Sequence, residues 1–325
     1  MAQGNAERGD AIPETPARLG MRAWFGVFKR AAKGFKTDNL TDWAAALTYY
    51  GVLSIFPALL VVVSLLGLMG RSATRSMIDN LGGLTPGPAR QILDTALQTL
   101  QSSRGAAGVA AIAGIAIALW SASGYVAGFM RASNAVYDIG EGRPIWKTLP
   151  TRIGITAVLV ILLAISAVAV VFTGTLADQA GRVLGIGQTA VLVWDIAKWP
   201  VLVIVVGLIF AILYGAAPNV RQPGFRWITP GSVLAVVLWI VASAAFGLYV
   251  ANFGSYNKTY GAMASVIIFL VWLWISNIAV LLGVELNAEL ERGRAIQAGY
   301  PLDKEPYVQP RDTTKLDGGS RASDL

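Results

Sequence analysis

The side chains best suited to chemistry in this 325-residue sequence follow its last long apolar stretch. Glu285 and Glu289 stand one helical turn apart there, with Asn287 between them. A carboxyl group at the border of an apolar segment is partly desolvated, so an opposite charge nearby would stabilise its ionised form. We hypothesise that Glu285 is ion-paired; the alternative is an ordinary helix end that reaches into water. The candidate partners are Arg131, Arg143, Lys147 and Arg152, with Asn134 as a neutral donor.

Two missing residue types exclude whole classes of chemistry. The sequence contains no cysteine and no histidine. It therefore has no thiolate nucleophile and no disulfide, and it lacks the usual general base and the commonest metal ligand. The Asp and Glu residues stand in tails and loops without the spacing of metal ligands, and no nucleotide-binding motif is present. We expect no enzyme, no cofactor and no metal site.

A second group of polar residues lies inside apolar stretches. Pro57 follows Tyr49, Tyr50 and Ser54, and it removes a helical N–H and frees a carbonyl one turn earlier. Asn277 places an amide in the last stretch. A buried polar group without a partner costs about 1–3 kcal/mol, so these groups should face protein or water rather than lipid. They predict either a polar cavity or, equally, a structural kink and a helix–helix hydrogen bond.

The segment 252–261, between the last two apolar stretches, combines glycines, amides and aromatic hydroxyl groups. It reads Asn-Phe-Gly-Ser-Tyr-Asn-Lys-Thr-Tyr-Gly, where an ordinary loop would carry plain charges. We expect an outer turn here, whose candidate site residues are Asn252, Ser255, Tyr256, Asn257 and Tyr260.

The elements that must position these residues are set by six windows of 22 to 31 residues without Asp, Glu, Lys or Arg. A helix needs roughly 20 apolar residues to cross a ~30 Å hydrocarbon layer. A charge near the bilayer centre costs about 2.5–3.5 kcal/mol on insertion scales. The sequence therefore predicts an all-α polytopic bundle, with Pro200 and Pro230 near helix starts. The expected spans are about 44–69, 105–130, 153–177, 199–220, 229–252 and 260–284.

Basic residues are distributed unevenly between the two sides of these spans. If the N-terminus lies inside, inner segments hold 19 of the 26 Lys and Arg residues and outer segments hold seven. Inner loops of membrane proteins carry this excess. Both termini are therefore expected in the cytoplasm.

The segments that flank the spans have distinct compositions. Residues 1–16 are expected to be a disordered tail, and 17–36 an amphipathic helix on the inner leaflet, with a helix packed on the bundle as the alternative. The membrane domain covers 37–295, with a short outer helix near 89–101, and 296–325 is expected to be a disordered cytoplasmic tail.

Three segments in a defined order point to a family. They are 44–57 (Ala-Ala-Ala-Leu-Thr-Tyr-Tyr-Gly-Val-Leu-Ser-Ile-Phe-Pro), Asn134 and Tyr137 followed by Glu-Gly-Arg-Pro-Ile-Trp-Lys at 141–147, and the run 252–292. Over about residues 35–295 the chain resembles the bacterial YihY/BrkB family, although Ile145 stands where that family usually has an aromatic residue.

The resemblance implies a multi-pass, six-span protein of the bacterial inner membrane. Members have carried a virulence-factor label and an old label of tRNA-processing ribonuclease. The second label conflicts with this sequence, because phosphodiester hydrolysis needs a metal cluster or a base.

Three classes of function remain. We expect a transporter or translocator of a lipid-like or amphipathic molecule, with a non-catalytic scaffold or complex subunit as the alternative. The third class, an enzyme acting on lipid at the interface, has no supporting group of residues. Expected partners are membrane lipids, including anionic lipid of the inner leaflet. The GxxxG spacing of Gly124 and Gly128 predicts close packing of neighbouring helices, with a homo-oligomer contact as the alternative. No nucleic acid is expected.

Overall fold

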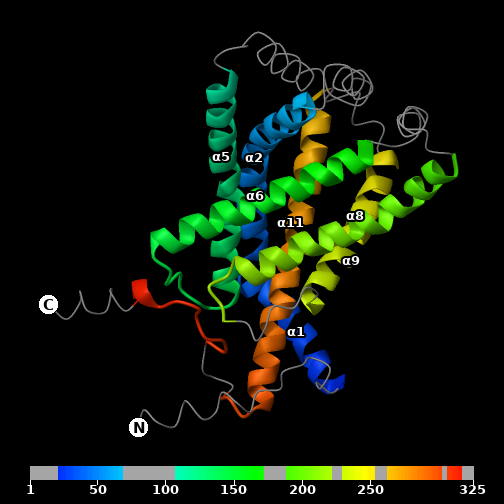
Figure 1. The fold of residues 1–325 in the computed structure, drawn as a ribbon. Coiled ribbons are helices and arrows are strands. Elements are labelled where there is room, and N and C mark those ends of the chain that lie inside the picture. Colours follow the sequence, from blue (N-terminus) through cyan, green and yellow to red (C-terminus); the bar gives the residue numbers. More distant parts are fainter. Residues whose placement is uncertain are drawn as a thin grey trace. The chain divides into compact units, whose positions relative to one another are not determined.

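The computed structural model describes residues 21–68, 107–171, 188–221, 229–252, 262–301 and 306–316. These residues are helical, apart from short connections and an isolated bridge between Val220 and Pro310. The all-α prediction is therefore confirmed for the described part of the chain. The helices, drawn in Figure 1, are α1 (Met21–Thr37), α2 (Leu40–Leu68), α5 (Ala107–Val136), α6 (Ile145–Val171), α8 (Gln188–Ala216), α9 (Pro230–Asn252) and α11 (Ala262–Gln297).

Four of these helices contain segments long and apolar enough to cross a membrane. They lie in α6, α8, α9 and α11, and they overlap the last four charge-free windows. Helices α2 and α5 overlap the first two windows. The count of six spans and the inward orientation of both termini stay predictions. The four segments are Ile145–Ala167, Val191–Ala216, Pro230–Val250 and Val266–Gln297.

Helix α8 begins at Gln188, earlier than the charge-free window, and it includes an ion pair. Lys198 Nζ lies 2.7 Å from Asp195 Oδ1, one helical turn away, and Lys198 is buried. Each residue of this pair neutralises the charge of the other within α8, although the predicted span began only at residue 199. Pro200 consequently lies within α8 rather than near its start, so that prediction is wrong.

The chain divides into two compact units. Unit 1 contains α1, α9, α11 and the C-terminal segment, and unit 2 contains residues 50–125 and 156–205. Four helices belong partly to one unit and partly to the other. The boundary between the units lies after residue 49 in α2, after 125 in α5, after 155 in α6 and after 205 in α8.

Unit 1 is organised around α11. Helices α9 and α1 both pack on it, α1 through Val27 against Leu286 and Leu290. The aromatic ring of Tyr214 stacks between those of Phe129 and Phe210, with centroids 6.2 and 6.1 Å away. These contacts bury apolar surface, which stabilises the unit.

Helix α1 has a second apolar face that is not buried. Met21, Phe25 and Phe28 are exposed beside the exposed Lys29 and Lys33. The helix thus packs on α11, as the alternative reading had it, and still presents an apolar and basic face of the kind that inserts into a lipid surface. Lipid binding by this face stays a prediction.

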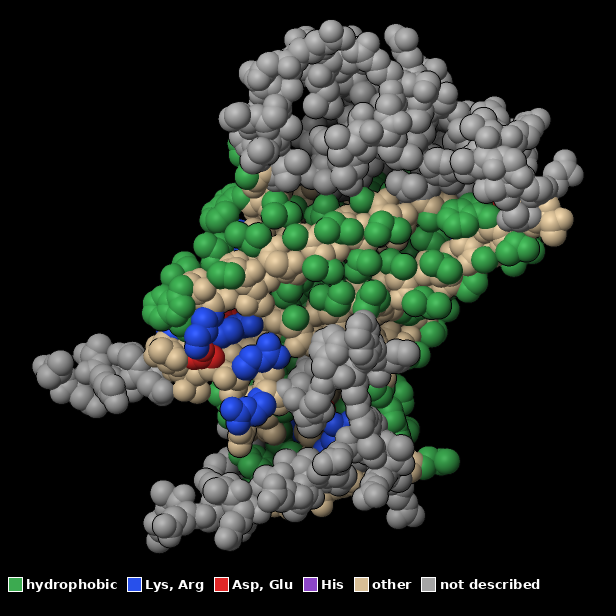
Figure 2. Space-filling model, in the orientation of Figure 1, with side chains coloured by type: hydrophobic (Ala, Val, Ile, Leu, Met, Phe, Trp, Pro, Cys, Tyr) green, Lys and Arg blue, Asp and Glu red, His purple; other side chains and the backbone are tan. Residues whose placement is uncertain are grey.

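The apolar side chains of the membrane helices are largely exposed within the protein. Figure 2 shows α6 and α8 covered by hydrophobic side chains. On α8 these include Leu192, Val193, Ile196 and Ile204. Such surfaces suit contact with acyl chains.

Part of the predicted tail is ordered. Residues 306–316 lie against the end of α8 and the connection between α5 and α6. The expectation of a disordered tail from residue 296 is therefore wrong for this segment, because backbone hydrogen bonds hold it. The predicted outer helix near 89–101 and tail 1–16 lie outside the described residues.

Candidate functional site

The connection between α5 and α6 carries a buried arginine. Helix α5 ends where Asp138 takes a left-handed conformation (φ 52°), and Pro144 stands immediately before α6. Between them Arg143 is 5% exposed and binds both carboxylate oxygens of Glu141, at 2.7 and 2.8 Å. It also donates to the Ala217 carbonyl at the end of α8 (2.8 Å). This bidentate pair fixes the turn geometrically as well as electrostatically.

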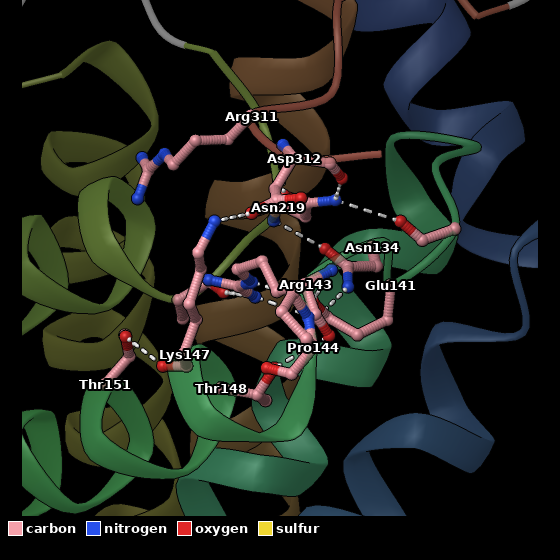
Figure 3. A network of polar contacts seen from close by, with 12 residues as sticks. Asn134, Glu141, Arg143, Pro144, Lys147, Thr148, Thr151, Asn219, Arg311 and Asp312 are labelled. Atoms are coloured by element: carbon pink, nitrogen blue, oxygen red, sulfur yellow. Dashed lines mark hydrogen bonds and ion pairs between the residues drawn. The ribbon is translucent and has the colours of Figure 1, made fainter. Parts of the chain in front are cut away.

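Asn134 and Asn219 extend this network across unit 1, as Figure 3 shows. Asn134 donates to Glu141 (2.9 Å) and accepts the Asn219 backbone N–H (2.8 Å). The Asn219 side chain donates to the Gly140 and Asp312 carbonyls and accepts from the Asp312 N–H. Its amide therefore bonds the backbone of two other segments, at Gly140 and at Asp312. We call Asn134, Glu141, Arg143, Lys147, Asn219 and Asp312 the polar junction.

Two carboxylates of the polar junction are held in the ionised form. Burial alone would raise the pKa of Glu141, but the hydrogen bonds and charge of Arg143, with the bond from Asn134, lower it below its ordinary value. Lys147 pairs with Asp312 at 2.5 Å, and this bond, together with those from Thr314, lowers the pKa of Asp312 strongly. Both groups thus stabilise the folded junction as anions.

Glu285 lies apart from these cations, so the prediction that one of them pairs with it is wrong for Arg143 and Lys147. Its side chain is 2% exposed, and its Oε2 has no hydrogen-bond partner within the part of the chain that the structure describes. The charges that act on it most strongly are acidic, namely those of Asp38, Glu289 and Asp138. The predicted partners Arg143 and Lys147 are instead engaged by Glu141 and Asp312.

Asn287 joins α11 to the start of α9. Its Oδ1 accepts the Gly231 N–H (2.9 Å), and its Nδ2 donates to Thr229 Oγ1 (3.0 Å). An N–H in the first turn of a helix has no partner within that helix, so Asn287 satisfies one such donor of α9. The two helices approach closely here, because a Cβ on Gly231 would lie 2.0 Å from the Gly283 carbonyl oxygen.

Asn277 makes a helix–helix hydrogen bond rather than standing alone. Its Nδ2 donates to Thr48 Oγ1 of α2 at 3.1 Å, and both residues are buried. Trp274, one turn earlier on α11, donates to the Thr41 carbonyl. The packing alternative for Asn277 is thereby supported.

The predicted site residues are spread over several places. Asn134, Asn277, Glu285 and Asn287 form four separate contacts within unit 1. Tyr49 is 62% exposed on α2. In unit 2, Ser54 donates to the Tyr50 carbonyl in its own helix at 2.6 Å, and nothing is described for the Pro57 side chain. Asn252 is the last residue of α9, and Ser255, Tyr256, Asn257 and Tyr260 lie outside the described residues.

Sequence reasoning named Asn134, Glu141, Arg143 and Lys147 but missed Asn219 and Asp312, and it did not predict the contacts that join them. The Glu-Gly-Arg-Pro motif at 141–144 is visible in the sequence, but its connection to Asn219 through Asn134 depends on the fold. Among the described residues, no group of three or more acidic side chains is placed to hold a metal ion.

Comparison with known proteins gives one consistent result. Residues 31–306 match the family described as Virulence factor BrkB. The chain is 30% identical over 265 residues to the putative ribonuclease-like protein YfkH of Bacillus subtilis, covering 81% of this chain and 93% of that protein. It is 28% identical to a UPF0761 membrane protein of Aromatoleum aromaticum, covering 90% of this chain and 69% of that protein. For a UPF0761 membrane protein of Xanthomonas campestris the identity is 27%, with coverages of 85% and 64%. No solved structure matches this chain.

Proposed function

Since this chain belongs to the virulence factor BrkB family and is a multi-pass membrane protein of the bacterial inner membrane, we propose that it is a non-catalytic translocator of an amphipathic, lipid-like molecule. The supporting observation is the low burial of its apolar helices. Only 6% of the α9 segment is buried within the protein, and 28% of the α8 segment. Long apolar faces of this kind can guide the tail of an amphiphile.

The polar part of such a molecule needs hydrogen-bonding groups beside these faces. Tyr49 is a candidate, because it is 62% exposed in an apolar helix and Leu53, one turn on, is exposed on the same face. An aromatic ring with a polar tip is suited to the boundary between acyl chain and headgroup. Tyr49 is therefore the residue we expect to contact the moving molecule.

The alternative function is a membrane scaffold. The bond between Asn277 and Thr48 favours it, because this amide joins two helices instead of facing a passage. The name of the Bacillus subtilis relative refers to that protein. Ribonuclease activity is not part of our proposal, because this sequence has no histidine and no cysteine to supply a base or metal ligands.

Reconstitution into liposomes tests the proposal. A fluorescent phospholipid is bleached by an impermeant reductant, and the wild-type protein should increase the fraction of probe that reaches the outer leaflet. Tyr49→Leu should slow this exchange severalfold without changing the melting temperature, while Leu53→Met should leave both unchanged. Asn277→Leu should instead lower the melting temperature, because it breaks the bond to Thr48. If wild-type protein accelerates the movement of no phospholipid and of no single-chain amphiphile, the scaffold is the better function.

A further inference from the structure

Two carboxyl groups lie against helix α1 at Gly34. Asp38 lies in the turn between α1 and α2, and Glu285 lies on α11. Both carboxyl groups approach the same residue of α1, Gly34. A Cβ built on Gly34 would lie 2.0 Å from Glu285 Oε1 and 3.2 Å from Asp38 Oδ2. We call Asp38 and Glu285 the carboxyl pair.

The charged groups around the carboxyl pair do not neutralise it. Arg30 of α1 pairs with Glu289, and Arg292 of α11 also contacts Glu289. Arg294 pairs with Glu291 at 2.7 Å. The acidic groups that also act on Glu285 are Glu289, which Arg30 and Arg292 contact, and Asp138 after α5. The nearby arginines are thus engaged with other carboxylates.

The surroundings of Glu285 are closed as well as acidic. Its side chain is 2% exposed, and its Oε2 is buried without a hydrogen-bond partner among the described residues. An ionised carboxylate in such a place would lack both water and donors, which costs several kcal/mol or more. Two carboxylates that approach the same residue, one of them buried, cannot both be ionised without strong repulsion.

We propose that the carboxyl pair is a proton-binding site, in which one proton is shared between Asp38 and Glu285. The proton forms an O–H bond on one carboxyl group and a hydrogen bond to the other, so that the pair carries a single negative charge. Because Asp38 closes α1 and Glu285 lies on α11, the shared proton joins these two helices. Loss of the proton to water leaves two negative charges under α1 and weakens its contact with α11. The inference stands whether the protein moves an amphiphile or serves as a scaffold.

The proposal fixes the sign of a pH effect on stability. In the unfolded chain both carboxyl groups are ionised above about pH 5. The folded protein therefore holds one more proton than the unfolded one at neutral pH. Its stability must fall as pH rises, by up to about tenfold in the folding equilibrium constant per pH unit. The fall continues until the pair itself has lost its proton.

Two measurements on the purified full-length protein in lipid nanodiscs test the site. Infrared spectroscopy detects the protonated carboxyl group, and unfolding at several pH values measures the dependence of stability on pH. At neutral pH the wild-type protein should show the carbonyl stretch of a protonated carboxylic acid. Glu285→Gln, which replaces the neutral acid by an amide of the same shape, should remove this band and flatten the dependence of stability on pH. Glu291→Gln is the matched control on the same helix, because Glu291 is paired with Arg294, and it should keep both the band and the slope.

Asp38→Asn provides a second variant should Glu285→Gln fail to fold, and it should also reduce the slope. The proposal is overturned if the wild-type protein lacks the band at neutral pH, or if neither variant changes the slope. It is also overturned if sodium ions stabilise the wild-type protein, but not Glu285→Gln, more than an organic cation at equal ionic strength. That result would assign the site to a metal cation.

Discussion

A single buried amide, Asn219, connects more of unit 1 than any charged residue of the polar junction. It is 0% exposed, and through its backbone and side chain it bonds Asn134, Gly140, Arg311 and Asp312. Each hydrogen bond contributes about 0.5–1.5 kcal/mol net, but a buried group left unpaired costs about 1–3 kcal/mol. The value of Asn219 thus lies in satisfying donors and acceptors from three segments together.

Asn219→Ala should lower the free energy of unfolding by about 2–3 kcal/mol, because three side-chain hydrogen bonds are lost in a buried place. Chemical unfolding of the purified protein measures this change, and proteolysis should cut residues 306–316 sooner. Gln297→Ala, at the exposed end of α11, is the control and should stay within about 0.5 kcal/mol of wild type. Equal effects of the two substitutions would contradict the role given to Asn219.

At the scale of elements, glycines allow α9 and α11 to approach each other closely. A Cβ on Gly231 would lie 2.0 Å from the Gly283 carbonyl oxygen, and one on Gly283 would lie 2.3 Å from the Tyr214 hydroxyl. Membrane helices lack a hydrophobic drive to associate, so close approach through small residues supplies their packing. Asn287 then adds the polar contact that sets the register of the two helices.

Gly231→Ala should separate α9 from α11 and destabilise the protein by about 1–3 kcal/mol, as overpacking does, because the obstructing atom belongs to the backbone. Gly247→Ala on the same helix meets nothing within 4 Å and should be neutral or stabilising by up to about 1 kcal/mol. Melting temperatures of the two variants in one detergent decide between them. A Gly231→Ala protein as stable as Gly247→Ala would show that the helices do not approach so closely.

At the scale of the whole molecule, four helices divide their length between two compact units. Polar contacts dominate in unit 1, which holds the polar junction, the carboxyl pair and the bonds of Asn277 and Asn287. The described part of unit 2 is mainly apolar, with the ion pair of Asp195 and Lys198 as an exception. In Figure 2 the visible Lys and Arg side chains gather in one region, beside Asp and Glu side chains.

The orientation can be tested directly, because the protein has no cysteine of its own. With six spans and both termini inside, Thr95→Cys should react with an impermeant maleimide from outside, and Gln309→Cys only in inverted vesicles. The reason is the excess of Lys and Arg on the predicted inner segments. Gln309 is exposed, so its reaction is not limited by burial. Labelling of Gln309→Cys in intact cells, or of Thr95→Cys only in inverted vesicles, would refute this topology.

The membrane character, the helical class and the family could all be derived from the sequence. Each depends on local properties, since the transfer free energy of a segment is nearly a sum over its own residues. Three segments in order, 44–57, 134–147 and 252–292, indicated the family, which the match over 31–306 confirmed. Helix ends were less predictable, because the pair of Asp195 and Lys198 placed charge inside α8.

The partners of the polar groups were decided by the tertiary structure. Glu285 was predicted beside a cation and lies beside Asp38, which is distant in sequence and reaches it only because α1 folds onto α11. Residues 306–316 have the composition of a tail, yet Asn219 and Lys147 hold them in place. A hydrogen bond or an ion pair depends on positions within a few ångströms, and the chain determines those positions only when its helices have packed.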